Sequence, residues 1–153
     1  MLCTVLFLLS TTIALCQETL TGKVVKIADG DTFTILIGGN KEVKVRFHGI
    51  DCPESKQDFG TRAKQFTSEL AFSKVVNVQV KDIDRYGRTI GIVVLPDGKI
   101  LNEELLRVGL AWHYKHYDKS EKYAALEDYS KANRLGLWST SNQIAPWEFR
   151  RSK

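Results

Sequence analysis

Short runs in which apolar and polar residues alternate dominate the first third of the chain. Residues 21–27 (TGKVVKI) and 32–37 (TFTILI) alternate in this way, and the ADGD sequence at 28–31 between them is typical of a hairpin turn. A second turn, GGN at 38–40, leads into residues 41–47 (KEVKVRF), which alternate again. Because a strand presents successive side chains to opposite faces, this pattern predicts a meander of three half-buried strands.

A helical pattern follows the third strand. Apolar residues recur at spacings of three and four within residues 61–73, which predicts an amphipathic helix. Residues 75–80 and 87–95 return to the strand pattern, with a turn containing DIDRY between them. We therefore expect two more strands after the first helix.

Capping residues mark two further helices. Asn102 is the predicted N-cap of a short helix over residues 103–108 that ends at a glycine. Asp118 and Glu121 have the spacing of a capping box at the start of a third helix, which stops before Gly136. The remaining residues are interpreted as a polar tail that ends in RRSK.

The order β-β-β-α-β-β-α-α matches the plan of the OB-fold, a small Greek-key barrel that many nucleic-acid-binding proteins use. The expected fold class is α+β, with a five-stranded OB-fold barrel and three α-helices. A length of 153 residues suits one domain. No internal repeat and no linker rich in Pro, Gly or Ser divides the chain, so we place a single domain at residues 17–153.

Residues 1–16 (MLCTVLFLLSTTIALC) contain no charged side chain. Their apolar run has the length of the hydrophobic region of a signal peptide, and Ala14 and Cys16 satisfy the small-residue rule for cleavage before Gln17. The prediction is a secreted or periplasmic protein. An uncleaved anchor and a lipid on Cys16 are the alternatives that would add a membrane contact, and mass spectrometry of the exported protein distinguishes the three.

Charge and cysteine content narrow the function only modestly. A net charge of +4 and a pI near 9.0 favour an anionic partner, although many proteins with such a charge bind no polyanion. Cys3 and Cys16 fall in the predicted signal peptide, so the mature chain keeps only Cys52 and forms no internal disulfide. No His stands at a telling spacing from Cys52, which we interpret as structural.

Acidic residues cluster on two of the predicted turns. Asp31 lies in the DGDT turn, and Asp51 and Glu54 flank the proline that ends the third strand in RFHGIDCPE at 46–54. Carboxylate oxygens suit Ca²⁺ or Mg²⁺, and a backbone carbonyl beside Asp51 would complete a site with open positions. No His/Cys pair is spaced for zinc. For the DGDT turn alone, capping of backbone N–H groups is the simpler interpretation.

Two arginines and Glu54, which is not among the predicted metal ligands, are the remaining candidate catalytic residues. Arg46 and Arg88, the latter in DRYGR at 84–88, offer planar forks of donors that match phosphodiester oxygens. A lone arginine would more simply pair with a neighbouring acid. Glu54 would orient or deprotonate an attacking water. If the three turns converge at one edge of the barrel, these residues predict a metal-assisted phosphodiester hydrolase.

The ordered motifs DGDT, VRFHGIDCPE, DRYGR and LNEELLRVGLAW resemble the thermonuclease, or staphylococcal nuclease-like, family over about residues 21 to 138. The resemblance implies a Ca²⁺-dependent endonuclease that hydrolyses DNA and RNA to products with 3′-phosphates. No obligate protein partner is implied, and a monomer is expected. The alternative is a non-catalytic OB-fold module that binds nucleic acid. The site residues carried over by motif are the Ca²⁺ ligands Asp31, Asp51 and the Cys52 carbonyl, the catalytic residues Arg46, Glu54 and Arg88, and the nucleotide-contacting residues Tyr86 and Tyr114.

Overall fold

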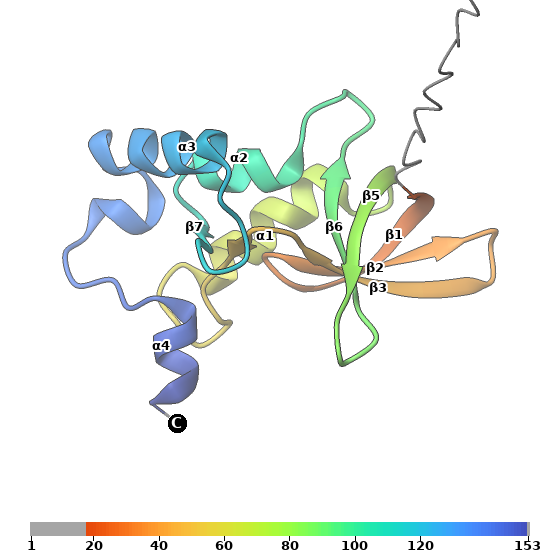
Figure 1. Ribbon diagram of the computed structural model, residues 1–153, viewed down its shortest axis with the longest axis horizontal. Helices are drawn as coiled ribbons and strands as arrows, with labels where there is room; N and C mark the ends of the chain where they lie inside the picture. The colour runs from red at the N-terminus through yellow and green to blue at the C-terminus, as the bar shows by residue number, and fades with distance from the viewer. Residues whose placement is uncertain (1–17, 153) are drawn as a thin grey trace, which may run out of the picture.

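The computed structural model describes residues 18–152 and shows a closed five-stranded barrel (Figure 1). Around the barrel the strands follow the order β1-β2-β3-β6-β5, and β5 pairs again with β1. Neighbouring strands are antiparallel except β3 and β6, which run parallel. This arrangement confirms the predicted α+β OB-fold. The barrel strands are β1 (Thr19–Asp29), β2 (Thr32–Ile37), β3 (Lys41–Phe47), β5 (Val75–Ile83) and β6 (Thr89–Val94).

The helices gather on one side of the barrel (Figure 1). The three predicted helices are present, and a fourth, α4, follows them near the C-terminus. Two short strands pair with each other between the barrel and the helices. These elements are α1 (Gly60–Ala71), α2 (Leu101–Arg107), α3 (Glu121–Ala132), α4 (Pro146–Arg151), the 3-10 helix η1 (Gly136–Ser139), β4 (Ile50–Asp51) and β7 (Trp112–His113).

The N-terminal prediction is not addressed by this fold. The predicted signal peptide at residues 1–16 lies outside the described residues and stays a prediction. Among residues 18–152, no helix has both the length and the apolar character needed to cross a bilayer.

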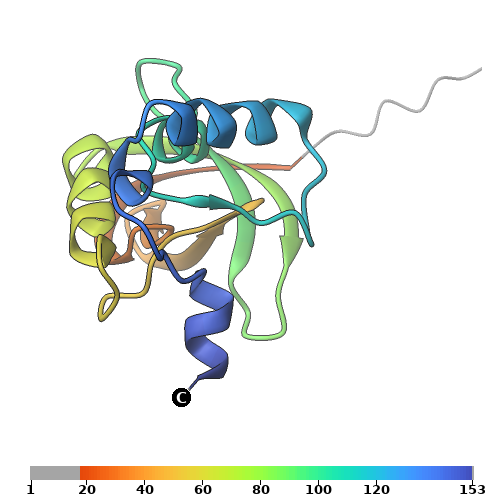
Figure 2. The same ribbon diagram turned by 90° about the vertical axis from the view of Figure 1, so that its left-hand side faces the viewer.

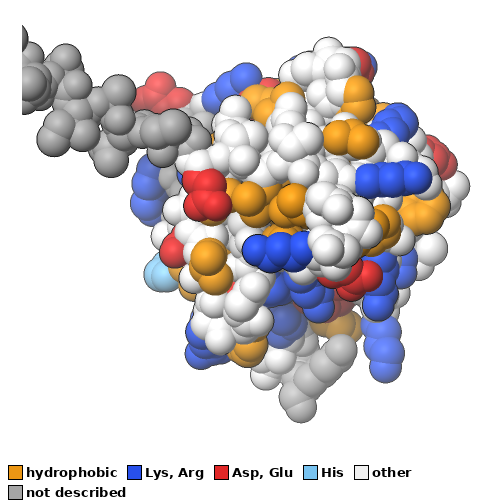
Figure 3. Space-filling model, turned by 90° about the vertical axis from the view of Figure 1, so that its right-hand side faces the viewer, with side chains coloured by type: hydrophobic (Ala, Val, Ile, Leu, Met, Phe, Trp, Pro, Cys, Tyr) orange, Lys and Arg blue, Asp and Glu red, His pale blue; other side chains and the backbone are white. Residues whose placement is uncertain are grey.

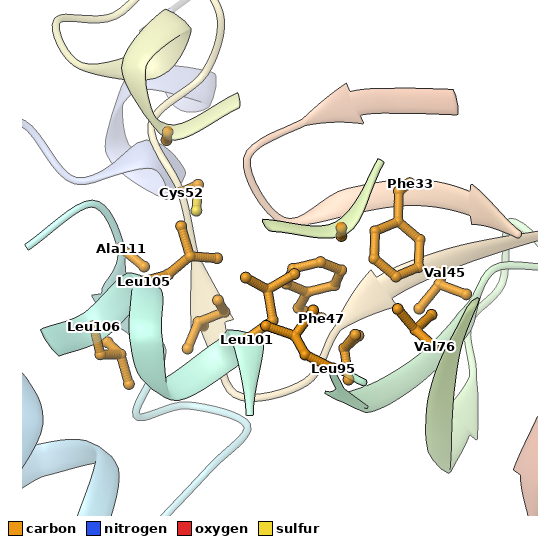
Figure 4. Close-up of a cluster of buried hydrophobic side chains, with 14 of the residues drawn as sticks. Phe33, Val45, Phe47, Cys52, Val76, Leu95, Leu101, Leu105, Leu106 and Ala111 are labelled. Atoms are coloured by element: carbon orange, nitrogen blue, oxygen red, sulfur yellow. The ribbon is translucent and has the colours of Figure 1, made fainter. Parts of the chain in front are cut away.

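The hydrophobic core runs from the barrel interior into the helical layer (Figure 4). Phe33 and Phe47 pack edge to face, with ring centroids 4.9 Å apart. Leu101 and Leu105 of α2 are fully buried on the helical side of the same cluster. Because burial of each such side chain contributes about 1.5–3 kcal/mol, the core holds the barrel and the helices together as one unit. Asn102 and Asp118, described next, are polar residues that connect the helical layer to the strands.

The capping role predicted for Asn102 is wrong. Helix α2 begins at Leu101, so Asn102 lies inside its first turn. Its side-chain oxygen accepts a hydrogen bond of 3.0 Å from the backbone N–H of Val93, and its amide donates to the carbonyl of His48 at 3.0 Å. The residue joins α2 to β6 and to the end of β3, because strand backbone groups left without a ladder partner need one when buried.

Asp118 is likewise not the N-cap of α3. Ser120 takes that position, and its hydroxyl accepts a hydrogen bond from the backbone N–H of Tyr123. The Asp118 carboxylate accepts from the backbone N–H of Ser120 and lies 2.9 Å from His113 Nε2 and 3.3 Å from His48 Nε2. Asp118 therefore connects the loop before α3 to β7 and to the turn after β3.

Candidate active site

The β1–β2 turn is pressed against α1 and the segment after β4, which brings its acidic residue into the interior. A Cβ atom on Gly30 would lie 2.7 Å from the Cβ of Ala63 and 3.0 Å from the side chain of Cys52, so only glycine permits this approach. The hydroxyl of Thr67 donates to the Gly30 carbonyl and ties the turn to α1. The neighbouring Asp31 is 1% exposed, and its Oδ2 accepts a hydrogen bond from the Cys52 backbone N–H.

Strand register places an arginine beside this buried carboxylate. In the β2–β3 ladder Arg46 lies opposite Thr32, the residue after Asp31. The Arg46 guanidinium donates from Nη1 to Asp31 Oδ1 and from Nη2 to Asp51 Oδ1, the second at 2.6 Å. Asp51 is fully buried on β4, which pairs with β7. One guanidinium therefore links a carboxylate from the β1–β2 turn to a carboxylate from β4.

Burial determines the electrostatics of this cluster. It raises the pKa of Asp31, a rise that the charge of Arg46 opposes and the nearby Asp51 carboxylate reinforces. Burial works to lower the pKa of Arg46, but the two carboxylates outweigh it and raise that pKa above its ordinary value, so the guanidinium stays charged. Burial also raises the pKa of the Cys52 thiol, in agreement with a structural role for this residue.

Arg46→Ala is expected to lower the free energy of unfolding by about 3 kcal/mol in metal-free buffer, because it leaves two buried carboxylates without their shared cation. This value is at the low end for breaking a buried ion pair, since 17% of the Arg46 side chain is exposed. Adding Asp31→Asn should restore part of the loss. Urea denaturation measures both variants, with the exposed Arg62→Ala as control. Wild-type stability of Arg46→Ala would show that Arg46 does not neutralise the acids.

A second arginine, supplied by α4, reaches the same acids from the exposed side. Arg150 donates from Nη2 to Asp51 Oδ2 at 2.7 Å and from Nη1 to Glu54 Oε1 at 2.6 Å. The Glu54 side chain lies at the rim and is 32% exposed. The structure thus brings together five of the predicted site residues and adds Arg150; the five are Asp31, Arg46, Asp51, Cys52 and Glu54.

Arg88 and Tyr86 lie apart from these acids, on the loop between β5 and β6. The Nε of Arg88 donates to Asp84 Oδ2 at 2.7 Å, and its guanidinium carbon lies 5.5 Å from the Tyr86 ring centroid. Within residues 18–152, Asp84 is the acid that Arg88 contacts. Two arginines do meet the acids, but the second is Arg150 rather than Arg88.

Tyr114, the other predicted nucleotide contact, is covered by α4. Its ring stacks on that of Trp147 with centroids 4.9 Å apart and planes 3° from parallel. Trp147 also packs edge to face against Trp112. These rings, with Lys115 and Lys131, line a cavity of about 320 Å³.

Comparison with known proteins identifies the family. Residues 44–140 match the family model described as staphylococcal nuclease homologue. The chain belongs to the staphylococcal nuclease family. The resemblance that the motifs indicate is thereby confirmed.

Relatives of this nuclease-family chain cover most of its length. It is 40% identical to an uncharacterized endonuclease of Haemophilus influenzae over 99% of this chain and 85% of that protein. It is 41% identical to a micrococcal nuclease of Shigella flexneri over 86% of this chain and 80% of that protein. A staphylococcal-like nuclease of Arabidopsis thaliana is 41% identical over 74% of this chain and 35% of its own length. These relatives support a nuclease function.

The acidic side chains of this family member are of the chemical type that hard divalent cations prefer as ligands. Asp31 and Asp51 carry the kind of oxygen that such a cation prefers, but Arg46, Arg150 and the Cys52 backbone N–H donate hydrogen bonds to these oxygens, so a bound cation would have to replace some of these donors. In the part of the chain that the structure describes, no group of three His, Cys, Asp or Glu side chains is arranged to hold a metal. The Ca²⁺ ligands that the motif resemblance implies, namely two carboxylates and the main-chain carbonyl of Cys52, therefore stay a prediction.

The C-terminal segment that we interpret as a polar tail contains the helix α4, which we did not predict from the sequence, and Arg150 was missed with it. The local signals were present in PWEFRR: Pro146 at the first helical turn, Glu148 near the start, and Arg150 and Arg151 in the last turn. They predict a helix. They do not predict where the helix packs, because six residues carry too little apolar pattern to identify a partner.

Proposed function

We propose that this protein is a calcium-dependent nuclease that hydrolyses the phosphodiester bonds of DNA and RNA and leaves 3′-phosphates. The observation that carries the proposal is the buried pair of carboxylates, Asp31 and Asp51, linked by the Arg46 guanidinium beside the partly exposed Glu54. Buried charged groups whose pKa values are shifted by burial and by specific partners occur more often at functional sites than elsewhere, which supports the proposal.

Each residue of this cluster has a chemical role in the proposal. Asp31, Asp51 and the Cys52 carbonyl would hold Ca²⁺, which supplies Lewis acidity and orientation at a phosphodiester oxygen when bound. Glu54 accepts a proton from water as the water oxygen forms a bond to phosphorus. The bond from phosphorus to the 5′-oxygen breaks, and that oxygen leaves with a proton from solvent. Arg46 donates to the phosphate oxygens, where negative charge accumulates.

Arg88 would act from the opposite side of the substrate. The loop that carries it and helix α4 project from the molecule in the same direction (Figures 1 and 2). A phosphate offers a guanidinium the same pair of oxygen acceptors as the Asp84 carboxylate does, so Arg88 can exchange one for the other. Its side chain is 29% exposed, which leaves it accessible to substrate.

The surface suits an anionic polymer with exposed bases. Tyr86 is 68% exposed beside Arg85 and Arg88, and aromatic rings next to cations stack on bases of any sequence. The cavity beside Tyr114 is lined by aromatic rings and by Lys115 and Lys131, and both lysines form ion pairs with Glu127 in the same lining. At the barrel end of the molecule, Lys and Arg side chains are scattered among neutral side chains and several Asp and Glu side chains (Figure 3). The cations and exposed ring of the β5–β6 loop favour contacts with phosphates and base faces over recognition of one base sequence.

Digestion of single-stranded DNA and of RNA in millimolar calcium tests the proposal. We expect both polymers to be cut, and mass spectrometry of the fragments to find 3′-phosphate ends. Tight, salt-sensitive binding of either strand without any cleavage would instead favour a non-catalytic nucleic-acid-binding module.

A further inference from the structure

Helix α4 supplies the cation Arg150 to the acidic cluster of Asp31, Asp51 and Glu54. None of the motifs that resemble the nuclease family contains Arg150. Arg150 makes three hydrogen bonds there: Nη1 to Glu54 Oε1 at 2.6 Å, Nη2 to Asp51 Oδ2 at 2.7 Å, and Nη1 to Asp51 Oδ1 at 3.3 Å. Charge-assisted pairs of this fork-like kind are directional as well as strong. The two acids raise the pKa of Arg150, against the opposing effect of its partial burial, so the guanidinium stays charged.

The position of Arg150 is fixed because the start of α4 packs against the rest of the protein. Ala145 and Pro146, at the start of α4, are buried. Trp147, three residues before Arg150, packs edge to face on Trp112 and stacks on Tyr114. Because positions three apart lie on the same side of a helix, the docking of Trp147 directs Arg150 toward the acids.

Hydrogen bonds of the Gln57 side chain connect the segment before α4 to the backbone of Glu54. The side chain of Gln57 donates from Nε2 to the carbonyl of Ile144 at 3.0 Å, and its Oε1 accepts from the backbone N–H of Glu54 at 2.9 Å. The backbone of Glu54 and the start of α4 are therefore held at a defined separation. This bridge places the two partners of the Arg150–Glu54 ion pair opposite each other.

Glu54 depends on Arg150 for its orientation. Among residues 18–152, Arg150 is the side chain that contacts the Glu54 carboxylate, and the contact engages Oε1 alone. Oε2 stays available for a water molecule. Without Arg150, Asp51 would keep its ion pair with Arg46, but Glu54 would lose the cation that holds it beside Asp51, and we expect its side chain to turn toward solvent.

We propose that Arg150 is a positioning residue for the hydrolysis reaction: it holds Glu54 beside Asp51 with one carboxylate oxygen free to receive the proton of the attacking water. This inference rests on the proposed nuclease function and extends it by making α4 part of the active site. It also explains how Glu54, on an exposed turn, keeps one orientation while the buried acids are held by Arg46.

The test compares steady-state kinetics of Arg150→Ala with those of Arg151→Ala, the adjacent exposed arginine on α4. Loss of an orienting partner commonly costs 10–100-fold, so we expect kcat of Arg150→Ala to fall by about that factor with little change in KM. Arg150→Lys should restore part of kcat, and so should millimolar guanidinium added to Arg150→Ala. Arg151→Ala should behave as wild type, and circular dichroism should show the same folded state in all variants.

A double-variant comparison decides whether Arg150 acts through Glu54. In a Glu54→Gln background, adding Arg150→Ala should cause almost no further loss, because the group that Arg150 orients is already gone. An equal further loss in that background would overturn the inference, and so would wild-type or higher activity of Arg150→Ala. An inactive wild-type protein would instead refute the nuclease function itself, so the two failures are distinguishable.

Discussion

Removing calcium is expected to slow hydrolysis of DNA and RNA by at least about 10³-fold, because a metal ion contributes several kcal/mol of charge stabilisation in the transition state. The ion would occupy the cluster in which Asp31 and Asp51 lie buried. The measurement is the initial rate of cleavage in millimolar calcium, in excess chelator, and after calcium is restored. Full activity in excess chelator would end the calcium-dependent proposal.

A second measurement of the same site does not depend on activity. A ligand that binds only the folded state stabilises it, so calcium should raise the melting temperature of the wild-type protein. Asp51→Asn should abolish that rise, since it removes one proposed ligand. Asp128→Asn, which changes an exposed carboxylate on α3, should keep it. A rise of equal size in both variants would place the calcium elsewhere.

Glu54→Gln is expected to lower kcat by about 10²–10³-fold while the fold survives. The amide keeps the size of the side chain, but it does not accept a proton from the attacking water. The side chain is 32% exposed at the rim of the cluster, so its substitution leaves the core intact. Steady-state cleavage of a defined oligonucleotide, together with circular dichroism, gives the rate and the folded state.

The matched control is Glu42→Gln, an exposed glutamate in β3. It makes the same chemical change on the same strand that carries Arg46, without touching the acidic cluster, and should cleave at the wild-type rate. Comparable activity of Glu54→Gln and Glu42→Gln would exclude Glu54 as the base and leave the water to be activated by another group.

The barrel was largely predictable because its signals are local. The predicted bounds of β2 (Thr32–Ile37) and β3 (Lys41–Phe47) agree with those observed, since alternating β-branched residues between glycine-containing turns specify a strand within a few residues. The capping assignments of Asn102 and Asp118 failed for the opposite reason. A short polar side chain near a helix start can bond its own helix or a distant strand, and the sequence does not distinguish the two.

By itself, the sequence determined the fold class and the chemical types at the site. Strand alternation and turn residues act over a few positions, and the acids and Arg46 sit on the strand ends that these patterns define. Only the tertiary structure decided which cations meet those acids. Arg88 pairs with Asp84 on its own loop, whereas Arg150 reaches the acids through the packing of α4 on Trp112 and Tyr114. Such contacts depend on core packing between distant segments, which no local pattern encodes.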